Sequence, residues 1–169
     1  MVDPLPPPPG LPREARLDSV AALTQAHDDV IALATRHVKV FDVDLSWGGW
    51  NSAPRCQTLS SFLRRSPGAR LDIIVHDTRW IEAMAARLTA LLARHAGTMT
   101  LYRTGSAARG AMDPLVIVDD LHFVHRPHID WPRGTLSIGS PERAKALVER
   151  FDEIWATGEP GVTGTVLGL

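Results

Sequence analysis

The sequence predicts an α/β fold in which a mixed sheet is layered with helices. Helical and strand periodicities alternate over the first two thirds of the chain, and three short strands then follow one another before a last helix. The expected order of elements is α-β-α-β-α-β-β-β-β-α. The chain has 169 residues, of which 44% are hydrophobic and 22% charged, and this size and composition fit one globular domain.

Each element follows from a local pattern. Apolar residues recur at helical spacing in the helices, β-branched runs mark the strands, and Ser140 with Pro141 starts the last helix. The predicted ranges, in chain order, are a helix over 17–34, a strand over 38–45, a helix over 54–66, a strand over 71–76, a helix over 78–96, strands over 98–104, 115–119, 121–125 and 135–138, and a helix over 141–157.

The two ends of the chain have a different composition. Residues 1–12 contain six prolines and predict a disordered arm, residues 13–157 form the single predicted domain, and residues 158–169 are expected to be a flexible tail. Cys56 is the only cysteine, which fits a reducing compartment. No signal peptide and no apolar run of membrane-spanning length are present, so we expect a cytoplasmic protein that does not enter a membrane.

Several segments carry a family resemblance. Residues 71–77 read LDIIVHD, and the segments VIVDD (116–120), FVHRP (123–127) and FDEIW (151–155) follow in order with suitable spacing. The region from about 38 to 157 resembles one half of a phospholipase D-type domain, and is most similar to a bacterial family of short, uncharacterised proteins with that fold. The resemblance implies a homodimer, because the family combines two half-domains about a two-fold axis. It also implies a link to acetyltransferases, since a similar domain can follow an acetyltransferase domain.

The signature of the phospholipase D family is H-x-K-x4-D-x6-G-S. If Asp119 is the signature aspartate, Met112 occupies the histidine position, Pro114 the lysine position, and Arg126-Pro127 the region of the G-S pair. The family's chemistry needs a histidine that attacks phosphorus and lysines that stabilise the phosphoryl oxygens. Methionine and proline can do neither, so the sequence predicts a catalytically degenerate domain with no catalytic residue and no cofactor.

A binding site remains a hypothesis, because loops at the carboxyl ends of strands build ligand sites in α/β layers. The candidate ligand-binding residues are Asp44, His76, Arg103, Asp119, His125 and Arg126. Arg126, together with Arg103 or His76, would hold phosphate or another anionic small molecule. The alternative is a structural ion pair of Arg126 with Asp119 or Asp120. No metal site is expected, because His122 and His125 point to opposite faces of a strand.

The leading functional prediction is therefore a binding or interaction module for an anionic ligand or a protein partner. Two alternatives stay open. One is a phosphodiesterase or phosphotransferase that uses His76 or His125 as an unusual nucleophile. The other is a nucleic-acid-binding domain, against which the net charge of −1 argues.

Overall fold

The computed structural model describes residues 13–162, so the predicted arm over 1–12 and residues 163–169 of the predicted tail lie outside the described part. Its elements are β1 (Arg13–Leu17), α1 (Val20–Ile31), β2 (His37–Asp42), α2 (Ala53–Arg65), β3 (Arg70–Val75), α3 (Arg79–Met84), α4 (Ala86–Arg94), β4 (Met99–Arg103), the 3-10 turn η1 (Ser106–Ala108), β5 (Leu115–Val118), β6 (His122–His125), β7 (Gly134–Ile138), α5 (Pro141–Trp155) and β8 (Glu159–Pro160).

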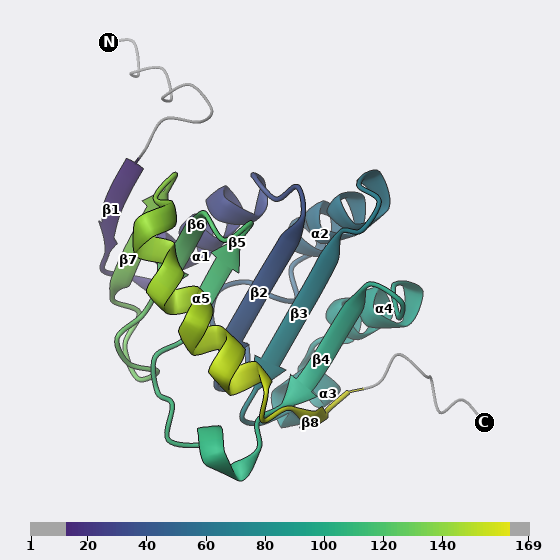
Figure 1. Ribbon diagram of the computed structural model, residues 1–169. Helices are drawn as coiled ribbons and strands as arrows, with labels where there is room; N and C mark the ends of the chain where they lie inside the picture. Colours follow the sequence, from purple (N-terminus) through teal and green to yellow (C-terminus); the bar gives the residue numbers. More distant parts are fainter. Residues whose placement is uncertain (1–12, 163–169) are drawn as a thin grey trace, which may run out of the picture.

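The strands form one mixed sheet in the order β1-β7-β6-β5-β2-β3-β4-β8 (Figure 1). The three strands β2, β3 and β4 are parallel, and the connections between them contain α2 and the pair α3–α4. On the other side of β2, each of the strands β5, β6, β7 and β1 is antiparallel to its neighbours in the sheet, and β5 is antiparallel to β2. The predicted fold class, a mixed sheet layered with helices, is confirmed.

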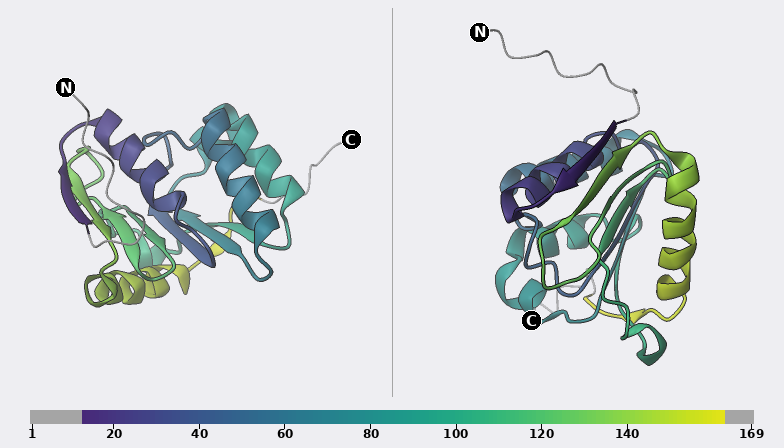
Figure 2. Two further views of the ribbon diagram at one scale, coloured as in Figure 1. Left: turned by 90° about the horizontal axis from the view of Figure 1, so that it is seen from above. Right: turned by 90° about the vertical axis from the view of Figure 1, so that its left-hand side faces the viewer.

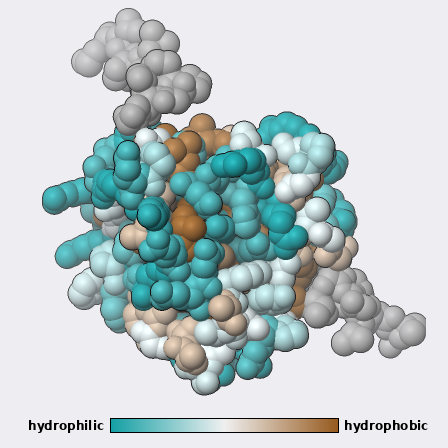
Figure 3. Space-filling model, viewed as in Figure 1, coloured by the Kyte–Doolittle hydropathy of each residue, from teal (hydrophilic) through white to brown (hydrophobic). Residues whose placement is uncertain are grey.

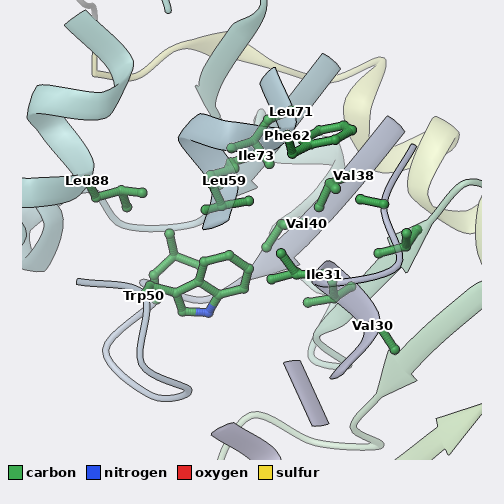
Figure 4. Close-up of a cluster of buried hydrophobic side chains, with 14 of the residues drawn as sticks. Val30, Ile31, Val38, Val40, Trp50, Leu59, Phe62, Leu71, Ile73 and Leu88 are labelled. Carbon is green, nitrogen blue, oxygen red and sulfur yellow. The ribbon is translucent and has the colours of Figure 1, made fainter. Parts of the chain in front are cut away.

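Helices cover both faces of the sheet. The helices α1, α2 and α4 lie on one face, and α5 lies alone on the other (Figure 2). Because side chains alternate along a strand, Val38 and Val40 of β2 pack in the core under α1 and α2, whereas Phe41 packs against α5. Trp50 is almost fully buried in the larger core (Figure 4). The face over α5 is mainly hydrophilic (Figure 3).

Three elements differ from the predicted order. Leu17 lies at the end of β1, which pairs with β7, and α1 begins only after Ser19, whose hydroxyl accepts a hydrogen bond from the Ala22 amide. The third predicted helix is divided into α3 and α4 at Ala85, whose backbone is not helical. Finally, β8 pairs with β4 in the region predicted as tail.

No helix in the stretch from residue 13 to residue 162 is long and apolar enough to cross a membrane.

Candidate functional site at the carboxyl end of the sheet

The carboxyl ends of β2 and β3 meet the start of β5 and the end of β6 at one edge of the fold. Phe41 of β2 pairs with Leu115, the first residue of β5, and Leu115 pairs in turn with His125, the last residue of β6. Met112 and Pro114 therefore lie beside the ends of β2 and β6. This is the part of the fold where Met112, Pro114 and most of the candidate ligand-binding residues lie.

On the face covered by α1 and α2, the guanidinium of Arg126 is buried. It donates hydrogen bonds to the Asp42 carboxylate at 3.3 Å and to the carbonyls of Ile129 at 3.3 Å and Trp131 at 3.1 Å. Its carbon Cζ lies 5.2 Å from the ring centroid of Trp47. Arg126 forms a structural ion pair, as the predicted alternative stated. Its partner is Asp42, so the predicted partners Asp119 and Asp120 are wrong.

Burial sets the electrostatics of this pair. Burial raises the pKa of Asp42 to about 6, although the charge of Arg126 opposes the shift. Burial likewise lowers the pKa of Arg126, against the charges of Asp42 and Asp44. The positive charge of the guanidinium is thus compensated by a carboxylate inside the protein, so Arg126 would attract an anionic ligand only weakly.

A cavity of about 330 Å³ opens next to this pair. Its lining consists of Asp42, Val43, Asp44, Ser46, Trp47, Arg126, Ile129 and Asp130. Three carboxyl groups in this lining face a single guanidinium. The cavity therefore does not have the charge that a phosphate site needs.

On the opposite face, under α5, a second polar cluster surrounds Asp113. Its carboxylate lies 3.0 Å from the ring nitrogen Nε2 of His125. It accepts one forked hydrogen bond from Nε of Arg150, at 2.7 and 3.0 Å, and a second from Nη2 of the same guanidinium. Partial burial would raise the pKa of Asp113, but the hydrogen bonds from His125 and Arg150 outweigh it and the pKa lies below its usual value. His125 is thus held by a carboxylate that stays ionised.

His76 also lies on the α5 face, at the end of β3. Its Nδ1 is 2.6 Å from the Thr104 hydroxyl and its Nε2 is 2.6 Å from the carbonyl oxygen of Ala111. A carbonyl can only accept, so Nε2 donates to Ala111, and in a neutral ring Nδ1 accepts from Thr104. Both ring nitrogens are therefore engaged, and neither is available to attack a substrate.

Asp119 lies at the other end of the sheet. Because β5 is antiparallel to β2, Val118 pairs with Val38 near the start of β2. The Asp119 carboxylate accepts hydrogen bonds from the amides of Thr35, Arg36 and His37 and from the Thr35 hydroxyl, all at 2.8 to 2.9 Å. Asp119 therefore fixes the turn between α1 and β2.

The structure divides the six predicted ligand-binding residues among four places. Arg126 and Asp44 line the cavity, His76 and His125 lie under α5, Arg103 faces Glu159 of β8 at 3.5 Å, and Asp119 lies at the other end of the sheet. His76 lies on the α5 face of the sheet, whereas Arg126 lies on the face covered by α1 and α2. The hypothesised combination of Arg126 with His76 is therefore not assembled. Within the described ranges no group of three or more metal-binding side chains converges.

Sequence reasoning missed three residues of these clusters, namely Asp42, Asp113 and Arg150. Asp42 had a usable signal, because it shares the strand face of the apolar residues Val38 and Val40. A carboxylate on an apolar strand face requires a buried partner. The pairing of Asp113 with Arg150 had no comparable signal, since 36 residues separate them in the sequence.

These features define the class of the domain. The fold is that of a phospholipase D-like domain, as predicted. The chain belongs to the family described as a domain of unknown function, DUF7931, whose model matches residues 19–163. The predicted membership of an uncharacterised family is thereby confirmed. No match is found among functionally curated proteins.

Solved structures with the same fold are distant in sequence. Nuc from Salmonella typhimurium, a phospholipase D family member, is 14% identical and superposes with a TM-score of 0.63 over 90% of this chain and 100% of its own. The archaeal chromatin protein TrmBL2 is 14% identical, with a TM-score of 0.65 over 88% of this chain and 54% of its own, so this chain spans about half of it. A phosphatidylserine synthase from Haemophilus influenzae Rd KW20 is 15% identical, with a TM-score of 0.56 over 96% and 43%. At these identities the likeness establishes the fold alone.

Proposed function

We propose that this chain is a phospholipase D-like interaction module without phosphodiesterase activity, and that it pairs with a second copy of itself through the carboxyl end of the sheet. One observation carries the proposal. Met112, which stands in the position of the family's nucleophile, is 39% exposed and lies in the same region as Trp131, which is 54% exposed. An apolar surface occupies the place where the family performs its chemistry.

The chemistry of this end supports binding of protein rather than of phosphate. Met112 offers no nucleophile and Pro114 no charge for a phosphoryl oxygen. The charge of Arg126 is compensated by Asp42, and Asp44 and Asp130 would repel an anion. Of the two ligand classes predicted from the sequence, the structure therefore favours the protein partner.

Three apolar residues of the two loops at this end make up what we call the sheet-end surface, namely Met112, Ile129 and Trp131. The Ile129 amide donates to the Met112 carbonyl at 2.8 Å, so the two loops are tied together. Methionine and aromatic residues are enriched at protein interfaces, and large exposed apolar patches commonly mark contact sites.

A second copy is the partner that the resemblance implies. Phospholipase D-type domains combine two half-domains about a two-fold axis, and an isologous contact at the sheet-end surface would bring the same patch from both copies together. The lengths of the similar chains fit this arrangement. Nuc is matched over its whole length, whereas the matched part of the synthase is less than half of that chain.

Sedimentation velocity at rising protein concentration tests the pairing. We expect the mass to approach twice the 18.5 kDa of one chain, and Trp131→Glu to return the protein to the monomer. Ala96→Glu is the matched control, because Ala96 is exposed and lies in the turn before β4, at the opposite end of the sheet. A wild-type protein that stays monomeric at all concentrations would overturn the proposal.

A second candidate function rests on the pair of His125 and Asp113. A histidine oriented by a carboxylate can act as a nucleophile, and Nδ1 of His125 has no hydrogen-bond partner among residues 13–162. Hydrolysis of bis(p-nitrophenyl) phosphate separates the two functions. We expect the wild type to be no faster than His125→Gln, and turnover that is lost in this variant would favour a phosphodiesterase.

A further inference from the structure

We propose that the groove between α2 and α4 binds a compact molecule that carries two or more phosphate groups. The two helices lie side by side on the helical layer of the fold, on the face of the sheet opposite α5 (Figure 2). Between them is a cavity of about 290 Å³ whose lining includes Arg64, Arg87, Arg94, Gln57 and Ser60. We call this cavity the α2–α4 groove. It is independent of the sheet-end surface.

The charge of the groove is positive and uncompensated. None of Arg64, Arg87 and Arg94 forms an ion pair with any residue from 13 to 162, and no carboxylate contributes to the lining. By contrast, the buried Arg126 is paired with Asp42. The field of the groove acts on His95 next to it: burial first, and then the charges of Arg94 and Arg64, lower the pKa of that imidazole.

Helix electrostatics explain two of the three arginines but not the third. Arg64 and Arg94 lie in the last turns of α2 and α4, where a positive charge interacts favourably with the helix dipole. Arg87 lies in the first turn of α4, where the same interaction is unfavourable. Asn51 nevertheless holds it there, because its backbone carbonyl accepts from the guanidinium at 3.4 Å and its side-chain oxygen from the Arg87 amide at 2.9 Å. An anion in the groove would offset this local cost.

The dimensions of the groove select a small polyanion. Arg87 and Arg94 are seven residues apart on one helix, which corresponds to a rise of about 10 Å. A guanidinium can bind a phosphate through two parallel hydrogen bonds, so three arginines around one cavity suit neighbouring phosphate groups. Nucleic-acid binding typically uses roughly 6–10 phosphate contacts, more than this groove provides. Gln57 and Ser60 add polar side chains to its lining, and the Ser60 hydroxyl lies 3.1 Å from Nε2 of His95.

Isothermal titration of the full chain with sodium tripolyphosphate at low ionic strength tests the proposal. We expect saturable binding at one site per chain, weakened roughly tenfold by Arg94→Gln and roughly tenfold by Arg87→Gln. Arg109→Gln is the matched control and should keep the wild-type affinity, because it removes the same charge from an exposed residue outside the groove. All three arginines of the groove are exposed, so the variants should fold, which circular dichroism can verify.

Three results would overturn the proposal. The first is the absence of measurable binding, or unchanged affinity when Arg87 and Arg94 are both replaced by glutamine. The second is equally tight binding of citrate, which would show that the groove does not recognise phosphate chemistry. The third is tighter binding of a single-stranded oligonucleotide than of tripolyphosphate, which would identify the groove as part of a nucleic-acid surface.

Discussion

The guanidinium of Arg126 lies between the Asp42 carboxylate and two backbone carbonyls, with the Trp47 ring against it. The raised pKa of Asp42 gives this pair a pH dependence. Between the usual aspartate pKa of about 4 and the folded value of about 6, the native state holds more protons than the unfolded chain. The contribution of Asp42 to stability therefore falls as the pH rises through this window.

Arg126→Met should destabilise the protein by about 3 kcal/mol in urea unfolding near neutral pH, because it leaves a buried carboxylate without its cation. The charge of Arg126 lowers the pKa of Asp42, so its removal extends the window upward. We therefore expect a larger deficit at about pH 8 than at about pH 5. The double variant Asp42→Asn/Arg126→Met should recover part of the loss. An equal deficit at both pH values would show that the carboxylate is not the cause.

Asp119 acts through backbone amides rather than through a cation. Partial burial would raise its pKa, but hydrogen bonds from His37, Arg36 and Thr35 outweigh this effect and the pKa is lowered. A lowered carboxyl pKa gives stability that is present above about pH 4 and is lost as the pH falls through the folded pKa. The stability that Asp119 contributes at neutral pH is thus lost in acid.

Asp119→Asn should cost about 2 kcal/mol of the free energy of unfolding at neutral pH, because the amide replaces a charged acceptor of several hydrogen bonds. The difference from the wild type should shrink in acid. Urea unfolding at a series of pH values measures both effects. Asp18→Asn is the control, since Asp18 is exposed and makes no hydrogen bond within the part that the structure describes. A pH-independent difference would contradict the assigned role.

At the scale of elements, the loop between β2 and α2 positions Trp47 against Arg126. Gly48 and Gly49 in this loop have φ angles of +93° and +80°. A Cβ atom at Gly48 would lie 2.5 Å from Nδ1 of His27, a distance that real side chains do not adopt. The loop therefore depends on glycine both for its backbone conformation and for its close approach to α1.

Gly48→Ala should lower the free energy of unfolding by about 2 kcal/mol and should change the fluorescence of the protein as Trp47 moves. Gly97→Ala is the matched control, because a Cβ there meets nothing within 4 Å and no positive φ is required. It should change stability by less than about 0.5 kcal/mol. If both substitutions had the same effect, the close packing at Gly48 would not matter.

The elements were predictable where local signals are strong. Pro54 and Pro141 mark the first turns of α2 and α5, and the β-branched run of β3 is found where it was expected. The candidate site was not predictable to the same degree, because it depends on which strands are neighbours and in which direction they run. The antiparallel pairing of β5 with β2 sends Asp119 to the far end, and Arg126 finds its partner 84 residues away in Asp42.

At the scale of the whole molecule, the two proposed surfaces lie at different parts of the fold. The sheet-end surface lies at the carboxyl ends of β2 and β3. The helix α4 leads back to the start of β4, which is beside the start of β3, so Arg94 in its last turn lies toward the opposite end of the sheet.

Substitutions at the two surfaces should therefore act independently. Arg94→Gln should leave the self-association constant within about a factor of two of the wild type, and Trp131→Glu should leave the tripolyphosphate affinity within the same range. Titration and sedimentation of the two single variants and of the double variant Arg94→Gln/Trp131→Glu give a double-mutant cycle. Distant sites without shared partners usually contribute additively, so a coupling of about tenfold would contradict this separation. Such coupling would mean that ligand binding between α2 and α4 changes the arrangement of the strand ends, and that the sheet transmits this structural change.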